Sequence, residues 1–332
     1  MRDDIILSLR DVKTYFPVES SREKLYVRAL DGVSLDVRRG EVLGLVGESG
    51  SGKSTLAYTV MGINRLTAGS IRLDGVSLDQ PYQRRPQALK RQLQIVFQDP
   101  ASALNPNQTI HQILSLPLKL FRKDLRGDQL TREVVRLLEM VQLPPSFMYK
   151  APGSIGGGER QMVCIARAMA CAPAFLILDE PTSALDVSIQ AKVINMLMRF
   201  RREREMTYLF ITHDLSLMRN IADRIVILYL GKVCEVADTL TFFTNPLHPY
   251  TQMLLSAIPV VSEEEEALRP QRVESVGEIP SPVHIPTGCS FHLRCPFKQE
   301  ICTQIDPVER EVEPGHIVRC HLCDGSAATA EQ

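Results

Sequence analysis

The feature that most constrains this chain is a glycine-rich segment at residues 47–55, with the sequence GESGSGKST. It fits the pattern G-x-x-x-x-G-K-[ST], and it lies between an apolar stretch that predicts a strand (41–46) and one that predicts a helix (56–63). Glycines let the backbone curl until its N–H groups point at phosphate oxygens, and a helix N-terminus adds positive potential. The segment therefore predicts a nucleoside triphosphate site.

Each residue of this phosphate loop has an expected part in that site. Lys53 supplies a point charge for the β- and γ-phosphates, and the Ser54 hydroxyl is a ligand for Mg²⁺. The residues expected to bind the nucleotide are Gly47, Glu48, Ser49, Gly50, Ser51, Gly52, Lys53, Ser54 and Thr55.

Two acids follow a second apolar strand, in the sequence FLILDE at 175–180. Ligands of open α/β sheets bind at the carboxyl ends of the strands, where these acids stand. Asp179 can hold Mg²⁺ through water, and Glu180 can polarise an attacking water molecule. An apolar strand ending in two acids is common by itself, but together with the phosphate loop it indicates hydrolysis of the nucleotide.

The order of apolar patterns predicts the fold class. Short strands come first, a long helical region lies at about 101–170, and strand, helix, strand follows from residue 175. Val134, Leu137, Leu138 and Val141 form the apolar stripe of a helix. Strand, helix, strand is the order of a parallel sheet with crossover helices, so the pattern predicts an α/β protein with a helical insertion. The predicted strands are 5–12, 27–37, 41–46, 175–180 and 207–214, and the helix between the last two is 189–204.

Composition limits the partners and the compartment. The 332 residues are 44% hydrophobic and 23% charged, with a formal net charge of -1, which is typical of a soluble globular protein and gives no reason to expect nucleic acid as a partner. No apolar run approaches the roughly 20 residues that span a bilayer. The first residues, MRDDIILSL, carry acids where a signal peptide carries bases. We expect a cytoplasmic protein that reaches a membrane only through partners.

The eight cysteines fall into two groups. Cys164, Cys171 and Cys234 lie in apolar stretches and are expected to be small buried side chains. The other five crowd near the C-terminus, where metal ligation or redox chemistry is favoured over disulfides in a reducing compartment. Four thiolates suit tetrahedral zinc or a four-iron cluster, and an apolar cluster without metal is the alternative. These five are Cys289, Cys295, Cys302, Cys320 and Cys323, in a proline-rich region after 245 that predicts an appendage held by turns.

Further motifs, in a fixed order, carry a resemblance to a known family. After the phosphate loop come VFQDP with Gln98, IGGGE at 155–159, DEPTSALD at 179–186 and ITHD with His213. In this order the chain resembles the ATPase subunits of ATP-binding cassette (ABC) transporters. The stretches LQIVFQDPASALNP and NPLHPYTQMLLSAIP, with the cysteine-bearing tail, are similar to the second ATPase subunit of oligopeptide/dipeptide importers. The resemblance covers nearly the whole chain.

The resemblance implies an architecture. It is a P-loop NTPase core of the ABC type, a mainly parallel sheet with an antiparallel β subdomain, interrupted by a helical signature subdomain and followed by a small extension. The implied parts are 1–100 (core with phosphate loop), 101–170 (helical subdomain), 171–244 (rest of the core) and 245–332 (extension with the cysteines).

It also implies roles for single residues. Gln98 would contribute to catalysis and the Mg²⁺ site and link that site to the helical subdomain, and His213 would stabilise the γ-phosphate and the attacking water. Asp186 would lie on the loop that crosses a dimer interface. An aromatic residue, Phe16 or its neighbour Tyr15, would stack on adenine.

One motif departs from the family pattern. The signature is usually Leu-Ser-Gly-Gly-Gln, and the spacing to IARA downstream places Gly156 at the Ser and Glu159 at the Gln. In the family this Ser and the following backbone N–H groups, here of Gly157 and Gly158, bind the γ-phosphate held by the opposite subunit. Ser154 fills that role only if the motif is shifted along the chain. Two such signatures would impair both sites of a homodimer, so the sequence predicts a heterodimer in which one site is weakened.

The resemblance finally implies partners and cofactors. Beside ATP and Mg²⁺, the wide cysteine spacing and the cofactor that the resembling importers carry favour a [4Fe–4S] cluster on Cys289, Cys295, Cys302 and Cys320, with zinc as the alternative. The partners would be a different second ATPase, two transmembrane permeases and an extracytoplasmic solute-binding protein. The chain would power uptake from the cytoplasmic face of the membrane. A soluble ABC-type ATPase outside transport, or a mainly regulatory subunit, are the alternatives, and the solute stays open.

Overall fold

The computed structural model describes residues 4–18, 25–258 and 277–324. The chain divides into two compact units, each of which is described by itself. The first unit comprises residues 4–6, 38–40 and 80–211, and the second comprises 7–37, 41–79 and 212–324. The four-part division implied by the sequence remains a prediction.

The first unit contains three parallel strands. β6 (Leu93–Val96) pairs with β7 (Phe175–Asp179), and β7 pairs with β8 (Thr207–Thr212), each in parallel. Every residue of β7 and β8 is buried, which explains their uninterrupted apolar sequence. The crossover between them is α7 (Val187–Arg204), as the sequence predicts.

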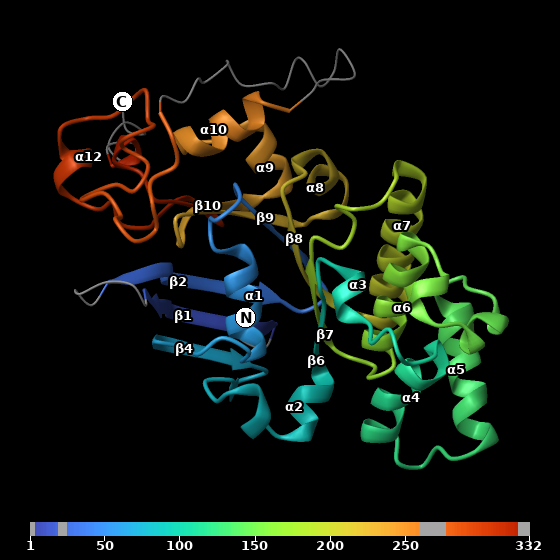
Figure 1. Ribbon diagram of the computed structural model, residues 1–332. Helices are drawn as coiled ribbons and strands as arrows, with labels where there is room; N and C mark the ends of the chain where they lie inside the picture. Colours follow the sequence, from blue (N-terminus) through green and yellow to red (C-terminus); the bar gives the residue numbers. More distant parts are fainter. Residues whose placement is uncertain (1–3, 19–24, 259–276, 325–332) are drawn as a thin grey trace. The chain divides into compact units, whose positions relative to one another are not determined.

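Helices make up the rest of the first unit (Figure 1). α4 (Ile110–Phe121), α5 (Asp128–Met140) and α6 (Gly157–Met169) pack on one another, which confirms the predicted helical region. On α5 the predicted stripe is buried, because its apolar residues share one face. The shorter elements are η1 (Tyr82–Arg84), α2 (Gln87–Gln92), α3 (Pro100–Ala103), η2 (Pro145–Tyr149) and η3 (Pro152–Ser154).

The second unit contains an antiparallel sheet of four strands, in the order β2-β1-β4-β5. This sheet agrees with the antiparallel β subdomain that the resemblance implies. The first two strands are longer than predicted, since each has 13 residues. The strands are β1 (Ile5–Pro17), β2 (Tyr26–Arg38), β4 (Ala68–Leu73) and β5 (Val76–Ser77).

A second set of strands in this unit carries the phosphate loop. β3 (Val42–Val46) pairs in parallel with β9 (Arg224–Tyr229), and β9 pairs antiparallel with β10 (Lys232–Asp238). β3 is buried throughout and leads into α1 (Lys53–Met61). α8 (Leu215–Ile221) lies between β8 and β9 in the chain and is N-capped by Asp214.

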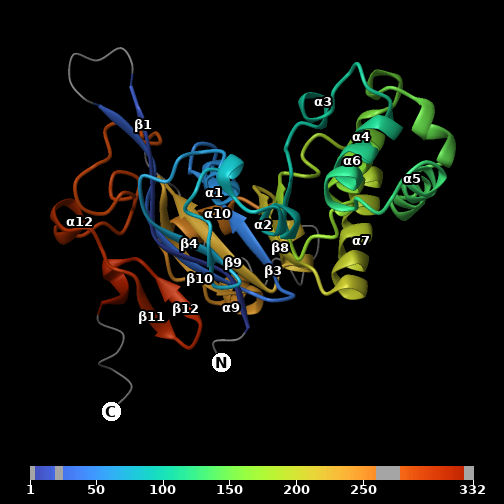
Figure 2. The same cartoon turned by 90° about the horizontal axis from the view of Figure 1, so that it is seen from below.

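The C-terminal extension belongs to the second unit and is more closely integrated than its composition predicts. It follows α9 (Thr239–Thr244) and forms α10 (Pro249–Ser256), α12 (Ile301–Gln304), β11 (Arg310–Glu313), β12 (His316–Val318) and η4 (His321–Cys323). β12 pairs with both β11 and β10 (Figure 2). Without β12, β10 would expose unpaired backbone groups along one edge. The extension therefore forms part of the sheet, through β12, and does not hang from the core by a linker alone.

Two further features of the sequence can be compared with the described residues. The sequence has four consecutive glutamates at 263–266, which lie outside the described residues. Among the residues that are described, none of the helices has the length and apolarity to cross a membrane.

Candidate functional site

The phosphate loop connects β3 to α1 and presents a helix N-terminus. The N-cap of α1 is Gly52, in the left-handed conformation with φ 109°, so no side chain at that position caps the first turn. Backbone N–H groups at such an end are suited to bind an anion. The Lys53 ammonium donates hydrogen bonds to the carbonyl oxygens of Gly47 (2.8 Å) and Glu48 (2.9 Å). The loop therefore curls around the ammonium group of the lysine that is expected to bind phosphate.

Two glycines of this loop are required by close packing. A Cβ at Gly47 would stand 2.2 Å from the carbonyl oxygen of Leu228, and one at Gly52 would stand 2.4 Å from that of Ala29. Both obstacles are backbone atoms, which cannot turn aside as a flexible side chain can. The pattern of glycines thus reflects how tightly β9 and β2 hold the loop. Ser49 and Gly50 are exposed at its tip, Ser51 is buried, and Ser54 and Thr55 are half-buried in the first turn of α1.

The two predicted acids lie in the first unit, at the end of β7. Asp179 is fully buried, while Glu180 is half-buried and has a positive φ of 45°. Such a conformation is rare for a residue with a side chain, and it often occurs where function fixes a side chain. The Gln98 amide donates a hydrogen bond of 2.9 Å to the Glu180 carboxylate. The structure thus brings together two of the three predicted catalytic residues, and the Gln98 donor leaves its amide oxygen for other partners.

The signature segment forms the start of α6. Gly156 is the N-cap, and the Glu159 carboxylate accepts a hydrogen bond of 2.7 Å from the Gly156 N–H. Glu159 thus closes a capping interaction within its own helix. The Ser154 hydroxyl, two residues before the cap, donates to the carbonyl oxygen of Ala151 at 2.8 Å. Gly156, rather than Ser154, occupies the position from which a side chain would reach past the helix end.

The signature glycines differ from those of the phosphate loop. A Cβ at Gly157 would meet no atom of the described residues within 4 Å, and one at Gly156 would come no closer than 3.6 Å to Glu159. Only Gly158 is packed, since its Cβ would lie 2.5 Å from Ile189 on α7. Packing within the described chain therefore does not explain why the first two residues lack side chains.

Four other predicted site residues have defined surroundings. Asp186 N-caps α7, where its carboxylate accepts from the Ile189 N–H (2.9 Å) and the Ser188 hydroxyl (2.6 Å), and these bonds lower its pKa. His213 is exposed in the second unit, directly after β8. Burial raises the pKa of Tyr15 to about 12, assisted by its hydrogen bond to Asp31, while the neighbouring Phe16 is exposed. Phe16 is the better candidate to stack on adenine.

The four cysteines predicted to hold a cluster gather in the extension. Burial raises the pKa of Cys289 to about 12, with smaller contributions from Cys320, Cys302 and Cys295, so these thiols lie near one another. Among the residues that the structure describes, no three His, Cys, Asp or Glu side chains form a group that could hold a metal ion. A single zinc needs four sulfurs about 2.3 Å from one point, so this arrangement does not fit zinc as it stands.

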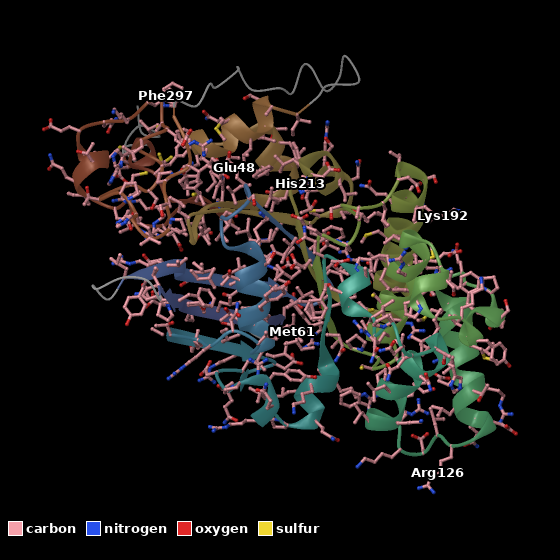
Figure 3. All side chains as sticks on the ribbon, in the orientation of Figure 1. Glu48, Met61, Arg126, Lys192, His213 and Phe297 are labelled. Atoms are coloured by element: carbon pink, nitrogen blue, oxygen red, sulfur yellow. The ribbon has the colours of Figure 1, made fainter. Side chains whose placement is uncertain are left out.

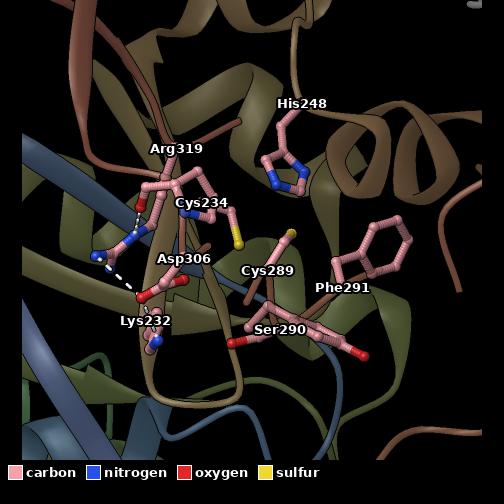
Figure 4. A pocket seen from close by; sticks show the side chains of 10 residues that line it. Lys232, Cys234, His248, Cys289, Ser290, Phe291, Asp306 and Arg319 are labelled. Atoms are coloured by element: carbon pink, nitrogen blue, oxygen red, sulfur yellow. Dashed lines mark hydrogen bonds and ion pairs between the residues drawn. The ribbon is translucent and has the colours of Figure 1, made fainter. Parts of the chain in front are cut away.

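Cys234 of β10 adds a further thiol to this neighbourhood. It lines a pocket of about 10 Å³ together with Cys289, His248 and Phe291, with room for about one water molecule (Figure 4). Cys234 is buried, as the sequence predicts, but its apolar surroundings gave no sign that it lies beside the C-terminal thiols.

Sequence analysis also missed two residues that contact the phosphate loop. Glu48, labelled in Figure 3, forms an ion pair with Arg294. Its backbone N–H donates to the Tyr250 hydroxyl at 2.9 Å. Tyr250 and Arg294 both come from the extension, about 200 and 246 residues further along the chain. No spacing pattern reports contacts over such separations.

Comparison with known proteins agrees with this geometry. The profile of the ABC transporter family matches residues 30–183, and the profile of the oligopeptide/dipeptide transporter C-terminal region matches residues 234–302. The chain is 43% identical to the oligopeptide transport ATP-binding protein AppF of Bacillus subtilis, over 96% of this chain and 98% of that protein. It is 38% identical to the di/tripeptide transport ATP-binding protein DppF of Pseudomonas aeruginosa, with the same coverage of both chains.

Solved structures give the same result for the fold. An ATP-binding cassette solved as a dimer in a post-hydrolysis state with ADP and Pi is 26% identical, with a TM-score of 0.63 over 70% of this chain and 99% of that one. The protein cbiO1 of Clostridium perfringens, part of an ABC transporter complex, is 27% identical, with a TM-score of 0.61 over 73% of this chain and 92% of that one. The fold and the resemblance expected from the sequence are both confirmed. The chain therefore belongs to the ATP-hydrolysing subunits of ABC transporters and, within them, to the oligopeptide/dipeptide transporter family.

Proposed function

We propose that this chain binds and hydrolyses ATP to power the uptake of peptides through a membrane transporter, from the cytoplasmic face of the membrane. The observation that carries the proposal is that an ABC ATPase region and the C-terminal region of oligopeptide/dipeptide transporters occur together in one chain. Relatives named for oligopeptide or di/tripeptide transport align with 96% of the chain, which supports peptides as the solute.

In the proposed reaction each site residue has one task. The phosphate loop holds the triphosphate through its backbone N–H groups and Lys53. The Glu180 carboxylate accepts a proton from the attacking water, and Gln98, which donates to that carboxylate, orients it. His213 stabilises the charge that grows on the γ-phosphate, and Phe16 stacks on adenine.

Mg²⁺ fits the donors that the chain offers. Ser54 provides a hydroxyl, Asp179 a buried carboxylate and Gln98 an amide oxygen, and hard oxygen donors of this kind suit Mg²⁺. When bound, the ion offsets the negative charge of the β- and γ-phosphates.

The coupling of ATP hydrolysis to transport depends on which subunits ATP contacts. ATP that touches two ATPase subunits only in a closed pair shifts the pair towards closure by differential affinity, and hydrolysis lets it reopen. We propose that two membrane-embedded permeases receive this movement and that an extracytoplasmic binding protein delivers the peptide to them. Under this scheme the peptide does not touch this chain.

We propose further that the partner ATPase is a different chain and that the two ATP sites are unequal. Gly156 has no hydroxyl to offer a phosphate bound on the partner, and a lost hydroxyl bond to a charged group costs roughly 1.5–3 kcal/mol. The site formed by this chain's phosphate loop and the partner's signature would then hydrolyse ATP, with Asp186 on the crossing loop. The opposite site would be weakened.

A [4Fe–4S] cluster on Cys289, Cys295, Cys302 and Cys320 is proposed as the cofactor of the extension. The nearness of the four thiols supports it, and a cluster would join distant parts of a segment that has few regular elements. Protein purified without oxygen should show broad absorbance near about 400 nm and about four iron atoms per chain. Cys295→Ser should lose both signals, whereas Cys171→Ser, at a buried thiol of the first unit, should keep them. Colourless protein with one zinc per chain would contradict the cluster.

Transport is tested in liposomes that contain this chain, its second ATPase and the permeases, with the binding protein outside. We expect ATP-dependent accumulation of labelled di- and oligopeptides, and loss of accumulation when this chain is omitted. ATP turnover without uptake of any peptide would contradict peptide import.

The inequality of the sites has a separate test. Glu180→Gln should reduce ATP turnover of the complex by roughly 100-fold or more, as removal of a general base does, while the equivalent change in the partner should have a much smaller effect. If only the change in the partner abolishes hydrolysis, the assignment of the two sites is reversed.

A further inference from the structure

The C-terminal extension reaches the phosphate loop through a paired arginine. The Arg294 guanidinium forms two hydrogen bonds with the Glu48 carboxylate, Nη1 to Oε2 at 2.6 Å and Nη2 to Oε1 at 3.0 Å. The side chains are 7% and 25% exposed, so the pair is largely shielded from water. A bidentate, charge-assisted pair fixes both distance and orientation. It also raises the pKa of Arg294, mainly through the hydrogen bonds to Glu48.

A tyrosine of the extension holds the same residue by its backbone. The Glu48 N–H donates to the Tyr250 hydroxyl at 2.9 Å, and Tyr250 is fully buried on α10. Its ring packs against Tyr229 and Phe291, with centroids 4.7 and 5.3 Å away. The Arg294 guanidinium lies 5.7 Å from the ring centre of Phe291. Packing against aromatic rings therefore holds both the Tyr250 hydroxyl and the Arg294 guanidinium in position beside Glu48.

The position of Glu48 affects the groups that are expected to bind the nucleotide. Its carbonyl oxygen accepts from the Lys53 ammonium at 2.9 Å and from the Ser51 N–H at 3.2 Å. A shift of the Glu48 backbone would therefore move both the lysine and the turn that surround the phosphates. In addition, Glu48 brings a negative charge into a loop that binds a more negative ligand, and Arg294 neutralises that charge.

We propose that Arg294 and Tyr250 are positioning residues of the ATP site, through which the C-terminal extension sets the affinity of the phosphate loop for ATP. Arg294 acts by orienting and neutralising Glu48, and Tyr250 acts by fixing its backbone. The inference rests on the proposed role of residues 47–55 in binding ATP. It adds that this loop does not reach full affinity without the extension.

The test measures ATP affinity and KM on the full-length chain, in the presence of Mg²⁺. Arg294→Gln leaves Glu48 without its partner and should weaken ATP binding by about tenfold or more, because a shielded charge-assisted pair is lost. Glu48→Gln in the same chain removes the uncompensated charge and should recover most of that loss. Tyr250→Phe removes a single oxygen and should weaken binding by about three- to tenfold. The effect should fall on KM, with kcat at saturating ATP changed by less than about twofold.

Two control variants separate positioning from general stability. Arg319→Gln removes an arginine of the extension that pairs with Asp306 at 3.6 Å. Tyr208→Phe removes a buried hydroxyl that bonds to the Leu197 carbonyl at 2.8 Å. Neither residue contacts the phosphate loop in any hydrogen bond or ion pair found among the described residues, so ATP affinity should stay within about twofold of the parent chain.

Each outcome decides the proposal. Unchanged affinity in Tyr250→Phe overturns it, even where Arg294→Gln does not fold, and so does a loss in Arg294→Gln that Glu48→Gln fails to recover. Equal losses in the controls overturn it too. Lys53→Ala in the same assay distinguishes the two levels of the account. If Lys53→Ala binds ATP normally, the proposed ATP site itself is wrong. If Lys53→Ala loses binding while Tyr250→Phe does not, only the positioning role fails.

Discussion

The phosphate loop and the signature segment both place glycines at the start of a helix, but for different physical reasons. In the phosphate loop, backbone oxygens of β9 and of β2 lie so close to Gly47 and Gly52 that no other residue fits. At the start of α6, the described chain leaves open space around Gly156 and Gly157. One set of glycines is fixed by packing inside the chain. Packing inside the described chain does not explain Gly156 and Gly157 of the signature segment, as expected if this surface contacts another molecule.

The largest difference between the two helix starts should appear when each is given a methyl group. Gly47→Ala forces a Cβ against the Leu228 carbonyl and should cost roughly 1–3 kcal/mol of stability, with ATP binding weakened in proportion. Gly157→Ala should instead stabilise α6 by about 0.5–1 kcal/mol, because alanine is the better helix former. Thermal unfolding and ATP titration of both variants measure the contrast.

If the two substitutions destabilise the isolated chain equally, the proposed difference between the two sets of glycines is wrong. The difference is supported if Gly157→Ala folds and binds ATP normally by itself but lowers ATP turnover in the assembled transporter. That result would place the reason for the small residue in the partner-facing surface.

A second prediction restores the missing hydroxyl. Gly156→Ser fits, since among the described residues its Cβ would meet only the Glu159 carboxylate, at 3.6 Å. If the hydroxyl is what the signature lacks, turnover at the weakened site should rise by roughly 10- to 100-fold, the equivalent of one hydrogen bond to a charged group. Turnover is measured in a complex whose other site is silenced by Glu180→Gln in this chain.

Ser154→Ala is the matched control for this prediction. Its hydroxyl bonds to Ala151 and lies before the helix cap, so turnover should not change. A fall in turnover would mean that Ser154 is the true signature serine, two residues before Gly156.

The smallest predicted effect concerns acid. Burial lowers the pKa of His248 to about 4, and its Nδ1 accepts a hydrogen bond from the Tyr250 N–H at the start of α10. Because an unfolded histidine takes up its proton near pH 6.5, the unfolded state binds more protons as the pH falls towards 4, and stability is lost over that range. The second unit, which carries the phosphate loop, should lose about 1 kcal/mol between about pH 6.5 and about pH 5.5.

Chemical unfolding of the parent chain and of His248→Asn at several pH values tests this effect. Asparagine can still cap α10 but does not titrate, so its stability should change less over the same range. Identical pH profiles for the two proteins would exclude His248 as the cause.

The parts of this structure that were predictable from sequence are those that depend on residues close together in the chain. The phosphate loop, the buried strands β3, β7 and β8, and the helical region up to α6 each follow from a local pattern of apolar residues, glycines and caps. The Glu159 cap was also visible in principle, because a Glu three residues after an N-cap is a known capping pattern. The sequence analysis instead placed Glu159 at the Gln position of the signature.

The parts that could not be predicted depend on contacts between distant segments. β12 pairs with β10 about 80 residues earlier, and Arg294 pairs with Glu48 across 246 residues. Arg294 stands in the sequence as one arginine beside Cys295, and nothing near it indicates a partner in the phosphate loop. Cys234 likewise has the surroundings of an ordinary core residue. In each case tertiary packing supplies the information.

The central claim is that the Lys53 loop clamps ATP and that this clamp drives transport. It is tested most directly by measuring ATP affinity and peptide uptake for Lys53→Ala in the reconstituted transporter. The account predicts that ATP binding to this chain is severely weakened and that uptake stops, while the complex still assembles. Unchanged affinity together with unchanged uptake would contradict it.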